Sequence, residues 1–179
     1  SVDRVIVENG AVLKVAEDIN VSELSSIVVK GRLEAESLSG DVDIINGSVD
    51  ITSLTGSVNV DGDNAQVSID EINGDLVMED GVLKPGNSPG KTVVNKNYTQ
   101  KTKARLEVEI AGSGTSPLEY DQLHVNGIMA LSGTLEIIFL DSYTIGLDTF
   151  KVLTFNQIAG QFDTINLPTL TSAYSWDIS

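Results

Sequence analysis

The sequence predicts an all-β protein in which short strands stack into a β-solenoid. Residues 38–83 repeat one pattern, a turn followed by two alternating apolar positions, which is typical of short, half-buried strands. The chain has only four Phe, four Tyr and one Trp among 179 residues, which fits a narrow interior of Val, Ile and Leu. All four prolines follow residue 84, so proline does not interrupt strand pairing before that point. A solenoid accounts for these features together, because each short coil buries its apolar face only against neighbouring coils.

The first 37 residues continue the pattern less regularly. The stretch 15–29 also allows a helix, because apolar residues recur there at helical spacing. The excess of β-branched residues and the Gly and Asn punctuation favour strands instead. The short apolar segments are RVIV (4–7), AVLKV (11–15), INV (19–21), SIVV (26–29) and RLEA (32–35).

The repeat sets the expected coil length. Two units make 16–18 residues and three make 25–27, so a three-sided coil of about 25 residues fits the repeat, but the sequence does not decide between two-sided and three-sided coils. Glycine punctuates the units at turn positions. The inward-facing pairs are expected to be Val42/Ile44, Val49/Ile51, Val58/Val60, Val67/Ile69 and Leu76/Met78.

The composition changes at residues 81–91, GVLKPGNSPGK, where Pro-Gly turns replace the regular repeat. We therefore divide the chain into short-strand solenoid coils at 1–80 and a continuation with longer strands and a C-terminal cap at 81–179, within one continuous domain. Leu106, Val108 and Ile110 should face inward. The more apolar segment 133–140 should be buried on both faces, and two further strands are expected at 150–155 and 161–165.

Charge and composition exclude several classes of function. The net charge of −15 repels phosphate backbones, so we expect no nucleic-acid partner. Residues 1–80 hold 17 acidic and 4 basic side chains, whereas 84–105 hold 6 basic and no acidic ones. The chain has no Cys, which excludes disulfides and a Cys nucleophile. No run approaches 18 apolar residues, so we expect no membrane insertion. The first residues, SVDRVIVENG, lack the apolar core of a signal peptide, as expected for a mature chain or an excised piece.

The second half contains an ordered set of segments: VLKPGNSPGKTVVNKNYTQ (82–100), RLEVEIAG (105–112), YDQLHVNGIMALSGTLEIIF (120–139), FKVLTF (150–155) and IAGQFDTINLP (158–168). This set, over about residues 81–178, resembles the conserved C-terminal region of exported bacterial β-helix proteins, including autotransporter passenger domains and PEP-CTERM-type proteins. The resemblance implies a right-handed parallel β-helix, a location outside the cell or on its surface, and usually no catalysis. It also implies that this region caps the helix.

The acidic residues are the first candidates for a binding site. Asp41, Asp43, Asp50, Asp61 and Asp70 alternate with apolar positions and should point outward. If successive coils stack in register, they form outer ladders that could bind Ca²⁺ or a glycan. A solvated face that prevents aggregation is the simpler interpretation.

One segment has the oxygen spacing of a calcium loop. Asn59, Asp61, Asp63 and Asp70 occupy positions 1, 3, 5 and 12 of NVDGDNAQVSID. However, Asn64 replaces the usual Gly at position 6, and position 12 lacks a Glu. These residues are therefore weak Ca²⁺ candidates, and we predict no catalytic, metal or cofactor-binding residue.

The remaining chemistry-bearing residues favour a structural interpretation. His124 is the only histidine and has no G-x-S-x-G partner motif or zinc-ligand set. A sugar cleft with a carboxylate pair usually also needs aromatic residues, and residues 1–80 contain none. The basic segment 84–105 could contact the acidic half of another copy, which would allow head-to-tail assembly. The aromatic residues gather near the C-terminus, as expected for a terminal core or an adhesive patch.

From these observations we expect a non-enzymatic structural or adhesion module that forms a stiff β-helical rod. Its partner would be a glycan, a host or cell-surface receptor, or a second copy. Two alternatives remain open: a carbohydrate-active β-helix enzyme and a self-assembling extracellular filament subunit.

Overall fold

The computed structural model describes residues 4–15, 19–20, 26–114, 119–140 and 143–178. Within them the regular structure consists of strands only, and all 18 strands belong to one sheet. Every pairing between these strands is parallel, which confirms the all-β prediction. The strands are β1 (Arg4–Val7), β2 (Val12–Val15), β3 (Ile19–Asn20), β4 (Ser26–Val29), β5 (Arg32–Ser39), β6 (Val42–Ile45), β7 (Ser48–Thr55), β8 (Val58–Asp61), β9 (Gln66–Ile72), β10 (Leu76–Met78), β11 (Val82–Leu83), β12 (Lys91–Val94), β13 (Tyr98–Gln100), β14 (Arg105–Ile110), β15 (Gln122–Leu131), β16 (Thr134–Phe139), β17 (Leu153–Gly160) and β18 (Thr164–Asn166).

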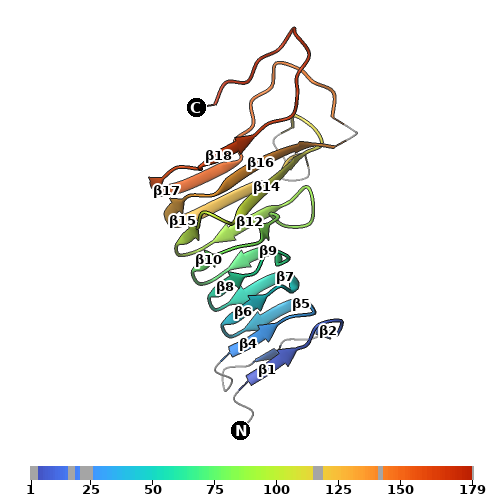
Figure 1. Ribbon diagram of the computed structural model, residues 1–179, viewed down its shortest axis with the longest axis vertical. Coiled ribbons are helices and arrows are strands. Elements are labelled where there is room, and N and C mark those ends of the chain that lie inside the picture. The colour runs from blue at the N-terminus through green and yellow to red at the C-terminus, as the bar shows by residue number, and fades with distance from the viewer. Residues whose placement is uncertain (1–3, 16–18, 21–25, 115–118, 141–142, 179) are drawn as a thin grey trace.

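The strands form three ladders, and the chain passes through them in turn as it climbs the stack (Figure 1). Ladder A contains β1, β4, β6, β8, β10 and β13. Ladder B contains β2, β11, β14, β16 and β18, and ladder C contains β3 and β12. Longer strands belong to two ladders: β5, β7 and β9 connect B to C, and β15 and β17 connect C to A.

The coils become longer along the chain. In ladder A, Val58 pairs with Leu76, Leu76 pairs with Tyr98, and Tyr98 pairs with Met129, so each of these turns takes more of the chain than the one before it. In the repeat region, Val42 pairs with Val58, which lies two units further along. In the repeat region two units therefore complete one coil, so the expected coil length of about 25 residues is wrong there, whereas the three ladders agree with a three-sided coil.

Three ladders arise from two repeat units because the second strand of each coil turns a corner. In β5 the buried side chains are Leu33, Ala35 and Leu38. Strict alternation would put Leu33, Ala35 and residue 37 on the same face of the strand. The next buried residue is instead Leu38, so the strand bends between Ala35 and Leu38 and continues on another side of the coil. The same step occurs in β7 and β9, at the corner between ladders B and C.

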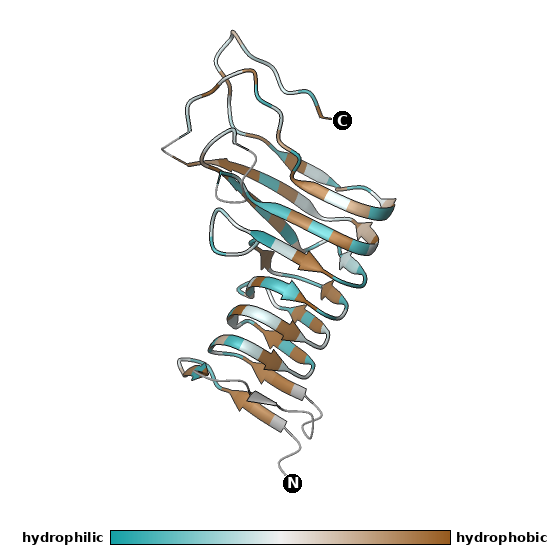
Figure 2. Cartoon of the chain, turned by 180° about the vertical axis from the view of Figure 1, so that it is seen from behind, coloured by the Kyte–Doolittle hydropathy of each residue, from teal (hydrophilic) through white to brown (hydrophobic). Residues whose placement is uncertain are grey.

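The core is a set of inward-facing columns with one residue from each coil. All ten residues of the predicted inward pairs are buried, which confirms the alternation, and Leu106, Val108 and Ile110 are buried as predicted. Figure 2 shows the resulting change between hydrophobic and hydrophilic residues along the strands. One column in ladder B contains Leu33, Val49, Val67, Leu83, Leu106 and Leu135.

The corner between ladders A and B requires small residues. A Cβ atom on Gly47 would lie 2.6 Å from the carbonyl oxygen of Val29 and 2.8 Å from that of Gly31, both in the preceding coil. Gly31 and Gly81 are under the same constraint, and Ala65 occupies the equivalent position between Gly47 and Gly81. Backbone hydrogen bonds continue through this corner, with Ser48 N donating to Gly31 O and Gln66 N to Gly47 O.

The C-terminal part differs from the prediction in two details. Residues 133–140 were expected to be buried on both faces, but only one face of β16 is buried, and Ile138 and Phe139 are half-buried. The strand expected at 150–155 is β17, which begins at Leu153 and extends to Gly160. Most of β17 and all of β18 are exposed, because they form the end of the stack. No helix that could cross a membrane occurs in the part of the chain the structure describes.

Candidate functional sites

Polar side chains at the corner between ladders C and A hold successive coils together. The backbone N–H of Ser57 donates to Asp41 Oδ1 at 2.8 Å, and the N–H of Asp75 donates to Ser57 Oγ at 3.3 Å. The N–H of Asn97 then donates to Asp75 Oδ1 at 2.9 Å, and the N–H of Ile128 to Asn97 Oδ1 at 3.0 Å. Asp41 therefore accepts a backbone donor of the next coil, which gives it a structural role.

The other members of the predicted acidic ladder do not form one continuous row. Asp43 lies in ladder A opposite Asn59, and Asp61 lies opposite Ile45. Asp50 lies in ladder B, opposite Glu34 on one side and Ser68 on the other. The rows are broken because each coil takes two repeat units, and the register then places a neutral residue of the next coil beside Asp43 and Asp50. Burial, with a smaller contribution from the nearby Asp50 charge, raises the pKa of Asp70.

The weak calcium candidates are separated by the strands. Asn59 and Asp61 belong to β8, Asp63 lies in the turn that follows, and Asp70 belongs to β9. In the described residues, no three Asp, Glu or His side chains come together in a group that could hold a metal ion. Asp61, Asp63 and Asp70 therefore do not converge.

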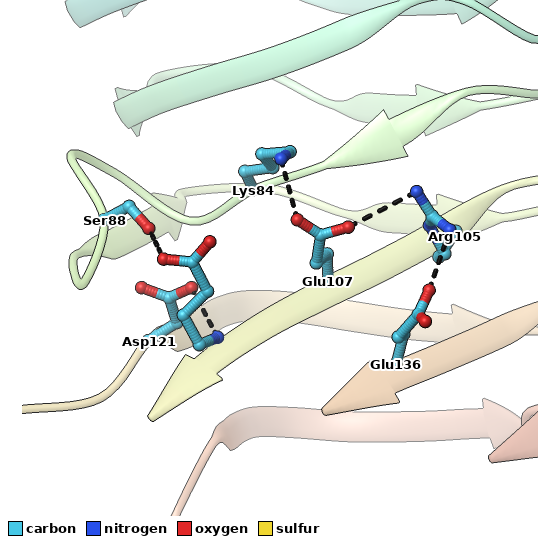
Figure 3. A network of polar contacts seen from close by, with 7 residues as sticks. Lys84, Ser88, Arg105, Glu107, Asp121 and Glu136 are labelled. Carbon is cyan, nitrogen blue, oxygen red and sulfur yellow. Dashed lines mark hydrogen bonds and ion pairs between the residues drawn. The ribbon is translucent and has the colours of Figure 1, made fainter. Parts of the chain in front are cut away.

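A network of charged side chains lies on ladder B, where the coils lengthen (Figure 3). Glu107 contacts Lys84 Nζ at 2.7 Å and Arg105 Nη2 at 3.3 Å. Arg105 Nη1 also contacts Glu136 at 2.7 Å, so the network joins three successive coils. Glu107 alternates with inward-facing Leu106 and Val108 and therefore lies on the outer face, yet it is buried beneath the two cations. Its carboxylate is fully engaged in ion pairs.

Asp121 is the buried carboxylate beside this network, and sequence reasoning did not single it out. Its Oδ1 accepts the N–H of Gly90 at 2.7 Å, and its Oδ2 accepts the N–H of Glu109 at 2.8 Å. Burial, opposed in part by these bonds, raises the pKa of Asp121 to about 6. Glu109 in turn accepts a hydrogen bond from Ser88 Oγ. The two motifs PGNSPG and YDQL therefore meet at Asp121, which shows that they form one structural unit.

A second buried polar pair lies inside the stack. Tyr98 is fully buried, and its hydroxyl donates to Gln100 Oε1 at 2.6 Å. Gln100 Nε2 donates to the carbonyl oxygens of Ser132 at 2.9 Å and Thr134 at 3.0 Å. Gln100 thus satisfies carbonyl groups of the next coil that would otherwise face the core. No sequence pattern marks Gln100, because it occupies an ordinary inward position.

His124 belongs to a row of amide side chains on ladder C. Its Nε2 lies 2.7 Å from Asn126 Oδ1. Asn126 Nδ2 donates to Asn95 Oδ1 at 2.7 Å, and Asn95 Nδ2 donates to Asn73 Oδ1 at 2.6 Å. The row connects three coils side chain to side chain, which agrees with the structural interpretation of His124.

Two hollows follow the corner between ladders A and B. The corner groove, of about 340 Å³, crosses four successive coils at 9–12, 30–32, 46–48 and 64–66. A second hollow, of about 380 Å³, lies farther along and is lined by Asp61, Glu79, Lys101–Lys103 and Ser132. Neither hollow contains an aromatic side chain. Both are open depressions of the molecular surface.

The aromatic residues near the C-terminus pack on one another. Tyr120 and Phe150 rings are 5.3 Å apart, and Phe150 and Tyr143 rings are 5.7 Å apart. Phe139 lies 4.7 Å from Tyr143 and 5.7 Å from Trp176. Most of these rings are half-buried against the core, so they form a continuous cluster rather than isolated exposed rings.

No family model, curated protein or solved structure matches the chain. The resemblance of residues 81–178 to exported β-helix proteins therefore stays a prediction from the sequence. The function has to be inferred from the ladders, the polar networks and the corner groove themselves.

Proposed function

We propose that this chain is a non-enzymatic module of an exported bacterial surface or secreted protein, in which a right-handed parallel β-helix acts as a stiff rod and an adhesive surface. Parallel ladders that continue from β1 to β18 support the rod. Each coil is bonded to the next by backbone ladders, by corner side chains and by a continuous apolar core. A stack of this kind resists bending because every coil contacts its neighbours over its whole cross-section.

The observation that carries the proposal is how the acidic side chains are used. Catalysis by a carboxylate pair requires both groups to face a substrate cleft. Here Asp41 and Asp75 accept backbone N–H donors, Glu107 is covered by two cations, and Asp121 is buried with both oxygens bonded. These carboxylates maintain the coils, which favours a structural module over a carbohydrate-active enzyme.

The C-terminal aromatic cluster supports a capping role for the last residues. Trp176 Nε1 donates to Pro168 O at 3.0 Å, which holds the final segment against the cluster. Tyr120, Phe139 and Phe150 belong to earlier parts of the chain. A cap of this kind covers part of the apolar cross-section that the last coil would otherwise expose.

A panel of polysaccharides incubated with the purified chain, with and without Ca²⁺, tests the proposal. We expect no new chain ends, and a small-angle scattering profile of an elongated particle. New chain ends would make the protein an enzyme and overturn the proposal. A compact scattering profile would contradict the rod. Asp50→Asn, an outward-facing change outside the contacts above, should alter neither result.

A second candidate function, a self-assembling filament subunit, is favoured by the exposed end of the stack. Phe155, Ile158 and Ile165 continue the columns of Val125, Met129 and Leu135, yet they are 40%, 50% and 39% exposed. Sedimentation velocity over a hundredfold range of protein concentration tests this candidate. A sedimentation coefficient that rises with concentration, and returns to the monomer value for Ile158→Lys, would support assembly through this end.

A further inference from the structure

The corner groove differs in charge from the rest of its half of the molecule. Residues 1–80 carry 17 acidic and only 4 basic side chains. Two of those four, Lys30 and Arg32, line the groove, and none of the residues that line it is acidic. Most charged side chains in residues 1–80 are carboxylates, so a depression in this part of the surface is expected to be lined by some of them. The groove is therefore a local gap in the acidic surface, with positive charge on one of its coils.

The cations of the groove are only partly neutralised by their neighbours. Arg32 Nε contacts Glu34 at 2.7 Å, but Lys14 Nζ contacts the same carboxylate at 2.6 Å, so two cations share one anion. Lys30 contacts Glu8 at the longer distance of 3.5 Å, and both side chains are exposed. Exposed ion pairs of this kind exchange readily with other anions, because solvent screens them and each contributes little to stability.

The rest of the groove offers amide groups in successive coils. Asn46 Oδ1 accepts the N–H of Asn64, and Asn64 Nδ2 donates to Asp63 Oδ1, so the ligand would use Asn46 Nδ2 and Asn64 Oδ1. Amides both donate and accept hydrogen bonds, which suits a hydroxyl-rich ligand. Coils are about 4.8 Å apart, so four coils extend over about 14 Å along the stack. Gly10 faces open space at the first coil of the groove, with a φ of +79° that disfavours a side chain. The four amide residues are Asn9, Asn46, Asn64 and Gln66.

We propose that the corner groove binds a linear polysaccharide with spaced carboxylate groups, which lies along the stack with its hydroxyls on the amides and a carboxylate against Lys30 and Arg32. This inference rests on the proposed function, since it names the partner of the adhesive surface. A densely charged polyanion fits less well, because the acidic surface on either side of the groove repels it. A neutral polymer has no charged group that could pair with Lys30 and Arg32.

Fluorescence anisotropy with labelled hyaluronan oligosaccharides, which carry one carboxylate per two sugars, tests the proposal on the full chain. Dextran oligosaccharides of equal length serve as the neutral probe. We expect hyaluronan to bind and Arg32→Gln to raise its Kd about tenfold, the effect of one lost charge-assisted hydrogen bond. Gln66→Glu, which adds an acidic group to the groove, should have a similar effect.

Lys14→Gln is the matched control. Lys14 contacts the same Glu34 carboxylate as Arg32 and is exposed, but it does not line the groove. Its removal changes the net charge by the same amount, and we expect the Kd to stay within about twofold. Circular dichroism of each variant confirms that the strands remain. An equal loss of affinity in Lys14→Gln and Arg32→Gln would show that only net charge matters and would overturn the assignment to the groove.

Three further outcomes are decisive. Absence of hyaluronan binding to the folded protein, or dextran binding of equal strength, would overturn the carboxylated ligand. Either result leaves the rod proposal intact, because that proposal is judged by chain cleavage and by the scattering profile. Cleavage of hyaluronan, by contrast, would overturn the non-enzymatic function, while the comparison of Arg32→Gln with Lys14→Gln would still decide whether the groove binds the polymer.

Discussion

Replacing Tyr98 by Phe should destabilise the protein by about 2 kcal/mol, because the change removes one hydroxyl from the interior and nothing else. The Tyr98 hydroxyl donates to Gln100 Oε1 at 2.6 Å, and both residues are buried, with exposures of 0% and 2%. Burial raises the pKa of Tyr98 well above its ordinary value, so the phenol remains a donor across the accessible pH range. The perturbation is therefore independent of pH.

The magnitude follows from what Gln100 can do after the change. An acceptor that is buried without a partner costs about 1–3 kcal/mol. The amide cannot turn over to find another donor, because Nε2 is held by the carbonyl oxygens of Ser132, Thr134 and Ala104 at 2.9, 3.0 and 3.2 Å. A turned amide would place Oε1 against those oxygens. We therefore expect about 2 kcal/mol, or a decrease in Tm of about 4–8 °C for a chain of this size.

Guanidinium denaturation followed by the β signal in far-UV circular dichroism measures the effect. Gln100→Met provides the second side of a double-mutant cycle, since it removes the partner and keeps the side-chain length. The double variant should be less destabilised than the sum of the single changes by about 1–2 kcal/mol. A Tyr98→Phe effect below about 0.5 kcal/mol, or strict additivity, would refute the reasoning that this pair satisfies buried polar groups.

Three further predictions use the same denaturation assay. Gly47→Ala should cost more than about 2 kcal/mol because its Cβ would lie 2.6 Å from Val29 O, whereas Ser48→Ala next to it should cost less than about 1 kcal/mol. Burial raises the pKa of Asp121 from 3.8 to about 6, so the folded state holds this proton more tightly than the unfolded state. Its contribution, at most about 3 kcal/mol, is present below pH 3.8 and is lost as the pH rises through about 6. Asp121→Asn should flatten that slope, and an unchanged slope would contradict the assignment. Arg105→Gln should cost about 1–2 kcal/mol because it leaves buried Glu107 with Lys84 alone. The exposed pair lost in Arg32→Gln should cost under about 0.5 kcal/mol, and equal effects would contradict the role of burial.

The alternation of the repeat made the inward residues predictable, because it is a property of neighbouring residues. Val49 and Ile51 face inward whatever lies above or below them. The coil length was not predictable in the same way. The corner between ladders B and C contains no Gly or Pro in β5, where it falls between Ala35 and Leu38. The only sign of the corner in the sequence is the longer spacing between these two apolar residues. Leu38 was interpreted instead as the first residue of a new repeat unit.

The polar sites could not be predicted because they depend on residues far apart in the chain. Asp121 is bonded to Gly90, which lies in an earlier coil, and nothing in YDQL distinguishes a buried carboxylate from a solvated one. Likewise the alternation around Glu107 indicates only that it faces outward, and it does not reveal that Lys84 and Arg105 cover it. The corner groove was missed because its residues come from four coils and form no local motif.

The lengthening of the coils gives the buried polar groups a common cause. The turn of the chain from Tyr98 to its partner Met129 is much longer than the turn from Val58 to Leu76 in the repeat region. Buried backbone polar groups need hydrogen-bond partners, and in these longer coils two buried side chains supply some of them. Gln100 satisfies carbonyls of the next coil, and Asp121 satisfies the N–H groups of Gly90 and Glu109. Substitutions at Gln100 or Asp121 should therefore weaken the contacts between successive longer coils. The shorter coils of the repeat region, which contain the corner groove, should be less affected. A groove variant such as Arg32→Gln should weaken ligand binding and leave the hydrogen bonds of Gln100 and Asp121 intact.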